Sequence, residues 1–169
     1  MPDAASQTDI VIAGAARTPM GAFQGDLSAM AAPQLGGIAI KAALGDAGCA
    51  ADVVEEVLMG CVLPAGVGQA PARQAGFAGG LDETVPASTV NKVCGSGMKT
   101  VMMAHDLIRA GSAGLVVAGG MESMTNAPYL SAATRGGARL GHAALKDHMF
   151  LDGLEDAYED GRLMGSFAE

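Results

Sequence analysis

Aromatic and charged residues are scarce in this chain. Of its 169 residues, 4% are aromatic, none is tryptophan and 17% are charged, yet 50% are hydrophobic. An interior with so few rings has to be built from aliphatic side chains and the 11 Met, and the 25 Gly allow backbones to approach one another closely. This profile favours a layered α/β protein and argues against a disordered chain.

Excess positive charge and long apolar runs are also missing. The formal net charge is −8, whereas nucleic-acid-binding proteins carry a basic face, so we expect no nucleic-acid partner. The longest apolar stretches, such as residues 114–120, are much shorter than the ~20 residues that a membrane span requires. Residues 1–9 have neither the basic region nor the apolar core of a signal peptide. We therefore expect a soluble, cytoplasmic protein that does not enter a membrane.

The three cysteines contain no CxxC pair, so the sequence predicts neither a disulfide framework nor a zinc site. Cys49 and Cys61 lie among small and apolar residues, and we interpret both as packing residues. His142 and His148 have no third ligand at a suitable spacing, so no metal site is predicted, and we expect both at a surface or interface. His105 lies on a helical apolar stripe and is expected in the interior.

Short apolar runs bounded by turn residues alternate with stretches of helical length. The predicted strands are residues 10–13, 57–63, 88–93 and 115–118, and the predicted helices are residues 33–47, 70–78 and 94–110. Strands that alternate with helices indicate parallel pairing and right-handed crossovers. Residues 123–169 are loop-rich, and we expect them to leave a core domain formed by residues 1–122.

The predicted helix 94–110 is apolar on most of its circumference. Its main stripe consists of Met98, Val101, Met102, His105 and Ile108. We therefore expect this helix to be buried on most sides and to end at Gly111.

Cys94 lies where a predicted strand runs directly into this helix. A thiol at a helix N-terminus is near unsatisfied N–H groups and the positive end of the helix dipole, which favour the thiolate nucleophile. Gly95 and Gly97 leave room for a substrate carbonyl. The alternative is a buried structural cysteine at a tight turn, and the local sequence does not decide between the two.

Several ordered blocks of this sequence resemble the thiolase family over nearly the whole chain. These blocks are residues 15–19 (AARTP), 60–66, 68–74 (GQAPARQ), 91–98 (NKVCGSGM), 118–124 (AGGMESM) and 164–169. The resemblance implies the N-terminal half of a thiolase-like layered α/β fold. It has a mostly parallel buried sheet, helices on both faces, and a loop domain that begins at residue 123.

The resemblance also implies the chemistry. Cys94 attacks an acyl-CoA thioester, and the acyl-enzyme condenses with acetyl-CoA to acetoacetyl-CoA or another 3-oxoacyl-CoA, or the reverse thiolysis occurs. The Cys94 N–H is one expected oxyanion donor, and Leu154 and Met164 are the expected apolar walls of the acyl and pantetheine channel. Leu163 occupies a position that is often polar in acetoacetyl-CoA-forming members, which leaves the acyl preference open. Coenzyme A thioesters are substrates, and no further cofactor is implied.

In the family, an activating His, a second Cys and an oxyanion-site Asn belong to the C-terminal half. We therefore expect residues 1–169 alone to be inactive, to expose a large apolar face and to associate. A homo-oligomer, dimer or tetramer, acting in fatty acid metabolism is implied, with residues 128–149 as a candidate contact. Two alternatives remain: a related condensing enzyme such as a ketoacyl synthase, and a non-catalytic half that pairs with a separate polypeptide. The AGGMESM and GQAPARQ segments favour thiolase over the synthase.

Overall fold

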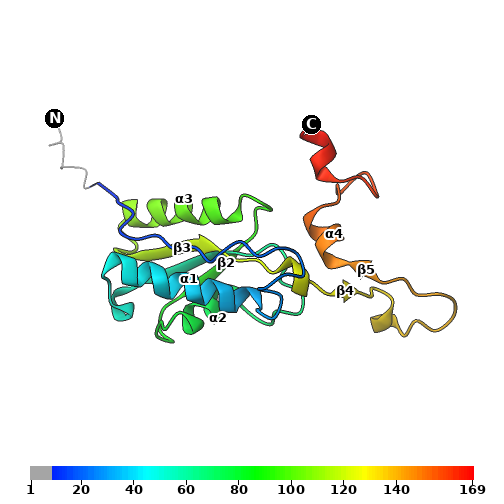
Figure 1. The fold of residues 1–169 in the computed structure, drawn as a ribbon, viewed down its shortest axis with the longest axis horizontal. Coiled ribbons are helices and arrows are strands. Elements are labelled where there is room, and N and C mark those ends of the chain that lie inside the picture. Colours follow the sequence, from blue (N-terminus) through cyan, green and yellow to red (C-terminus); the bar gives the residue numbers. More distant parts are fainter. Residues whose placement is uncertain (1–8) are drawn as a thin grey trace.

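A three-stranded parallel sheet forms the centre of the computed structural model, which describes residues 9–169 (Figure 1). Its strands are β1 (Glu56–Gly60), β2 (Ala87–Val90) and β3 (Val116–Gly120), in the order β2-β1-β3. Leu58 on the central strand pairs with Ser88 on one side and Ala118 on the other. Parallel strands end at the same edge of the sheet, so residues that follow β1, β2 and β3 are brought together there.

Helices cover both faces of the sheet. In Figure 1, α3 (Ser96–Arg109) lies on one side of the sheet, and α1 (Ala32–Ala47) and α2 (Pro71–Ala78) lie on the other. The predicted α/β class, with a parallel sheet between helices, is confirmed. The predicted helices agree with the observed ones to within two residues at each end.

Local sequence signals explain where α1 and α2 begin and where α1 ends. Pro33 lies in the first turn of α1, and Pro71 is the first residue of α2, where a missing N–H costs nothing. Gly48 then ends α1 in the left-handed region with φ 63°, and the Cys49 N–H donates to Leu44 O at 3.0 Å.

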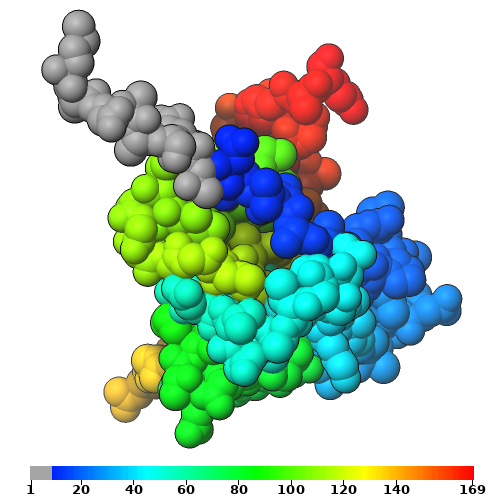
Figure 2. Space-filling view, turned by 90° about the vertical axis from the view of Figure 1, so that its left-hand side faces the viewer, coloured from blue at the N-terminus to red at the C-terminus, as the bar shows by residue number. Residues whose placement is uncertain are grey.

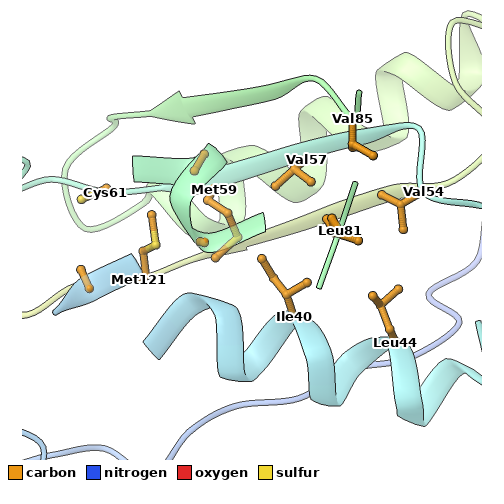
Figure 3. Close-up of a cluster of buried hydrophobic side chains, with 12 residues drawn as sticks. Ile40, Leu44, Val54, Val57, Met59, Cys61, Leu81, Val85 and Met121 are labelled. Atoms are coloured by element: carbon orange, nitrogen blue, oxygen red, sulfur yellow. The ribbon is translucent and has the colours of Figure 1, made fainter. Parts of the chain in front are cut away.

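The main hydrophobic core lies between the sheet and α1 with α2. Figure 3 shows Ile40 and Leu44 of α1 facing Val57 and Met59 of β1, all of them buried. Full burial of one such side chain stabilises the fold by about 1.5–3 kcal/mol. Cys61 belongs to this cluster and Cys49 packs against it, so the interpretation of both as packing residues is confirmed.

Residues 10–13 do not form a strand, so this prediction is wrong. Val11 and Ile12 are 74% and 78% exposed. A strand requires a hydrogen-bonding partner, and a groove of about 1010 Å³ separates this segment from β3 and α3. Figure 2 shows residues 9–16, in dark blue, over a hollow bordered by yellow-green and cyan residues.

The prediction about a signal peptide concerns residues 1–9, of which all but the last lie outside the described part of the chain. Among the described helices, none combines the length and the apolar character that crossing a bilayer would demand.

Residues after β3 form an irregular arm that leads away from the sheet in Figure 1. It contains a small antiparallel pair, β4 (Tyr129–Leu130) with β5 (Lys146–Asp147), followed by α4 (His148–Gly153). The arm also contains short 3-10 turns: Met124–Asn126, Thr134–Gly136 and Met164–Phe167. Another such turn, Ala51–Val53, precedes β1.

Candidate functional site

Cys94 lies on a tight turn between β2 and α3. Val93, just before it, has φ 48°, a left-handed conformation that is strained for a β-branched residue by about 1–3 kcal/mol. Asn91 Oδ1 accepts from the Val93 N–H at 2.9 Å. Ser96 Oγ accepts from the Lys92 N–H at 2.8 Å and donates to Val93 O at 2.6 Å. These bonds hold the turn, and the Cys94 thiol is exposed rather than sealed in packing.

The first turn of α3 lies directly on the sheet. A Cβ added at Gly60, the last residue of β1, would be 2.7 Å from Ser96 Cβ and 2.9 Å from Gly97 N. Thr100, one turn further, is fully buried, with its hydroxyl 2.7 Å from Gly97 O and 2.9 Å from Gly119 O. Only small residues allow this approach, and the contact fixes where the helix begins. The helix begins two residues after Cys94, whereas the sequence predicted a start at Cys94 itself.

Cys94 lines a pocket of about 420 Å³ at the edge of the sheet where β1, β2 and β3 end. The pocket walls are mostly apolar and small: Gly60, Val62, Leu63, Val93, Ser96, Gly97, Gly120, Met121, Met124, Met149, Gly153 and Leu154, together with Glu122. Residues from four separate segments of the chain thus meet around one exposed thiol. Such a shape suits the acyl part of a substrate whose carbonyl reaches the sulfur.

Of the two predicted apolar wall residues, the structure places one in this pocket. Leu154 lines it together with Cys94. Met164 does not line it and is 41% exposed, although its N–H donates to Leu154 O at 2.8 Å. The roles of both residues toward substrate stay predictions.

Glu122 is the site residue that our reasoning from the sequence missed. Its carboxylate accepts from the Val62 N–H at 2.8 Å and from the Leu63 N–H at 3.0 Å. The Cys61 thiol also donates to it, at 3.6 Å. A carboxylate at the end of an otherwise apolar strand was the available signal, but its partners lie about sixty residues earlier in the chain.

Cys61 and Cys94 differ sharply in their surroundings. Cys61 is 2% exposed, and burial, with a further contribution from the Glu122 charge, raises the pKa of its thiol to about 12. A thiol with that pKa stays protonated at neutral pH and is a poor nucleophile. Cys49 is partly buried, so Cys94 is the only exposed cysteine among the described residues.

Comparison with known proteins agrees with this geometry. The profile described as "Thiolase, N-terminal domain" matches residues 10–169. The chain belongs to this family. Acetyl-CoA acetyltransferase of Cupriavidus necator is 53% identical to this thiolase domain over 96% of the chain and 41% of its own length. Acetyl-CoA acetyltransferase 2 of Arabidopsis thaliana is 53% identical over 95% of the chain and 40% of its own length. The thiolase domain described here thus spans about 40% of the length of these relatives.

Two histidines of the thiolase domain lie where we did not expect them. His105 was predicted in the interior, but its side chain is 51% exposed and lies 3.2 Å from Asp106, because its stripe on α3 faces away from the sheet. His148 was predicted at a surface or interface, but it is buried within the chain, with 5% of its surface exposed. Its Nδ1 lies 2.5 Å from Asp152, and its Nε2 accepts from the Ala65 N–H at 3.3 Å, so it ties α4 to the core.

The pocket contains few groups that could move a proton. His142 is exposed, as predicted, and no histidine lines the pocket. Its two ionisable lining residues are Cys94 and Glu122, and the Glu122 carboxylate already accepts two backbone N–H bonds. Within residues 9–169, no three His, Cys, Asp or Glu side chains are grouped so that they could hold a metal ion.

Proposed function

We propose that this thiolase domain carries the nucleophile of an acyltransferase that uses coenzyme A thioesters. In the proposed first half-reaction, the Cys94 thiol gives its proton to a base and the thiolate attacks the thioester carbonyl carbon. The bond from carbon to the coenzyme A sulfur breaks, and coenzyme A leaves as its thiol after taking up that proton. In the second, the α-carbon of acetyl-CoA loses a proton and attacks acyl-Cys94, which gives acetoacetyl-CoA or another 3-oxoacyl-CoA and returns the Cys94 thiolate. The reverse sequence is thiolysis.

The exposed Cys94 thiol in an apolar pocket is the observation that supports this proposal most directly. The strained turn at Val93 and the contacts of Ser96 present the sulfur just ahead of the helix start. The similar proteins of C. necator and A. thaliana carry the name acetyl-CoA acetyltransferase, which points to acetyl-CoA as one substrate.

The proposal also requires a base for the Cys94 thiol and a second group for the α-carbon proton. The lining residues of the pocket supply neither group. We propose that both come from a C-terminal half that corresponds to the part of the longer relatives that this chain does not match. Cytoplasmic location, expected from the composition, is part of the proposal. Homo-oligomeric assembly and a role in fatty acid metabolism are also part of it and rest on the family resemblance.

Acyl-enzyme trapping tests the proposal. The protein that carries this chain, expressed at its native length, is mixed with acetyl-CoA, quenched in acid and digested for peptide mass spectrometry. We expect one acetyl group on the peptide that contains Cys94, its loss in Cys94→Ala, and its retention in the matched control Cys49→Ala. Turnover of acetyl-CoA with no acetyl group on Cys94, or with the label on Cys61, would refute the assignment.

A non-catalytic assembly half is the second candidate. The observation in its favour is the absence of a histidine from the lining of the Cys94 pocket. Under this alternative, Cys94 stays unacetylated in the native-length protein and the Cys94→Ala variant assembles and turns over substrate like the parent. Loss of turnover in Cys94→Ala with unchanged assembly favours the acyltransferase.

A further inference from the structure

Glu122 connects the ends of two neighbouring strands at the rim of the Cys94 pocket. It lies two residues after the end of β3, and its carboxylate accepts from the N–H groups of Val62 and Leu63, which follow β1. Both donor–acceptor distances, 2.8 and 3.0 Å, are within the normal range of protein N–H···O hydrogen bonds. The carboxylate therefore fixes the direction in which the chain leaves β1.

The segment that Glu122 holds is one wall of the pocket. Val62 and Leu63 line the pocket together with Cys94, and Leu63 is 5% exposed. Leu63 also packs close to Gly153 of α4, where an added Cβ would be 3.3 Å from Leu63 Cδ2. Two residues later, the Ala65 N–H donates to His148 Nε2 at 3.3 Å. The wall is thus anchored to β3 at one end and to α4 at the other.

We propose that Glu122 is a positioning residue of the reaction: it holds Val62 and Leu63 at the distance from Cys94 that the bound acyl group requires. The inference rests on the proposed acyltransferase function. Glu122 itself transfers no proton in this scheme, because both of its oxygens are held by backbone N–H groups. Its effect reaches the substrate through the two residues whose N–H groups it accepts.

Glu55 provides a matched comparison within the same sheet. It precedes β1, and its Oε2 accepts from the Gly114 N–H at 3.0 Å, just before β3. Glu55 and Glu122 therefore join the same two strands through a carboxylate, Glu55 where the strands start and Glu122 where they end. Glu55 does not line the Cys94 pocket. If a carboxylate between these strands served stability alone, the two residues would behave alike.

The test compares Glu122→Gln, Glu122→Ala and Glu55→Gln in the native-length protein. An amide has one acceptor oxygen, so Glu122→Gln keeps one of the two N–H bonds and Glu122→Ala keeps neither. We expect KM for acetyl-CoA to rise roughly tenfold in Glu122→Gln and further in Glu122→Ala, because a displaced wall weakens acyl binding. Glu55→Gln makes the same change of carboxylate to amide but keeps one acceptor oxygen for the Gly114 N–H, so it should leave KM within about twofold of the parent.

Labelling of the thiols gives a second readout that needs no turnover. In the parent protein, iodoacetamide should label Cys94 and spare Cys61, which is 2% exposed. In Glu122→Gln, loosening of residues 61–63 should make Cys61 accessible and change the Cys94 labelling rate at least threefold, and Glu55→Gln should do neither.

The outcomes separate the two proposals. Equal KM values and labelling rates in Glu122→Gln and Glu55→Gln would overturn the positioning role while leaving the acyltransferase function intact. If the parent protein never forms acetyl-Cys94, the acyltransferase function fails, and with it any role of Glu122 in that reaction. Labelling would then show only whether Glu122 holds the wall.

Discussion

The two faces of α3 carry side chains of different size. The face toward the sheet presents Ser96, Thr100 and Ala104, all buried. The opposite face presents Met98, 69% exposed, and Met102, 50% exposed, with Val101 between them at 43%. The small residues allow the helix to approach β1 and β3 within contact distance, whereas the large apolar ones have no cover within residues 9–169. Close approach is thus encoded by small side chains, whereas the large ones form an exposed apolar stripe on the opposite face.

The largest loss of stability should come from a substitution that fills the contact between β1 and the small-residue face of α3. In Gly60→Ala the new Cβ would lie 2.7 Å from Ser96 Cβ, so the first turn of α3 has to move. Overpacking of this kind costs about 1–3 kcal/mol. Urea unfolding should show the loss, and the iodoacetamide labelling rate of Cys94 should change with it.

Gly45→Ala is the control for that experiment. Gly45 lies within α1 and has no atoms within 4 Å of an added Cβ. The same substitution there should raise the free energy of unfolding by about 0.5–1 kcal/mol. If Gly60→Ala proved as harmless as Gly45→Ala, the close contact beneath Cys94 would not exist.

A smaller effect is expected from the hydroxyl beneath α3. Thr100→Val keeps the shape of a fully buried side chain but removes the hydroxyl that lies 2.9 Å from Gly119 O. Loss of one such hydrogen bond costs about 0.5–1.5 kcal/mol net. Thermal unfolding should show the loss in Thr100→Val, and Thr100→Ser, which retains the hydroxyl, should recover most of it.

The buried thiol of Cys61, unlike the exposed thiol of Cys94, should make the stability of the fold depend on pH. Burial and the Glu122 charge raise the pKa of Cys61 from 9.0 in the unfolded chain to about 12 in the fold. The folded state therefore keeps a proton that the unfolded state loses between these values, so stability should fall as pH rises from 9.0 toward 12 and be unaffected below that window. Thermal unfolding of Cys61→Ala across the same range should show a shallower decline. An equal decline in both proteins would contradict the shifted pKa.

Polar substitutions on the outward face of α3 should affect folding least. Met98→Gln and Met102→Gln replace exposed side chains, so the free energy of unfolding should change by less than about 0.5 kcal/mol. Association is the property expected to change: sedimentation of residues 1–169 should show larger species for the parent sequence than for the double variant. A parent chain that sediments as a compact monomer would contradict the interpretation of this face as uncovered.

The sequence predicted best those structural features that depend on a single helix or strand. Alternating apolar runs and helical stretches predicted three strands and three helices, because hydrophobic period and turn residues are local properties. The fourth predicted strand, residues 10–13, failed because an apolar run specifies a strand only when a neighbour pairs with it. The period of α3 likewise revealed an apolar stripe but not the direction in which it faces.

The site was predicted less completely than the fold. Cys94 could be found because a thiol between small residues at the start of a helix is a local signal. Glu122 could not be assigned its role, since Val62 and Leu63 reach it only through the pairing of β1 with β3. The burial of His148 had a weak signal, a carboxylate four residues later at Asp152, but its contact with Ala65 is long-range.

The left-handed conformation of Val93 has a consequence for how far the nucleophile motif can be transferred. A β-branched residue leaves that conformation as soon as its surroundings permit, because the strain amounts to about 1–3 kcal/mol. The strand before it and the helix after it supply the constraint cooperatively. A short peptide of residues 91–98, or the same eight residues grafted onto an unrelated scaffold, would relax from this conformation and leave the sulfur in solvent. The position of the nucleophile therefore depends on the layered fold and not on the motif alone.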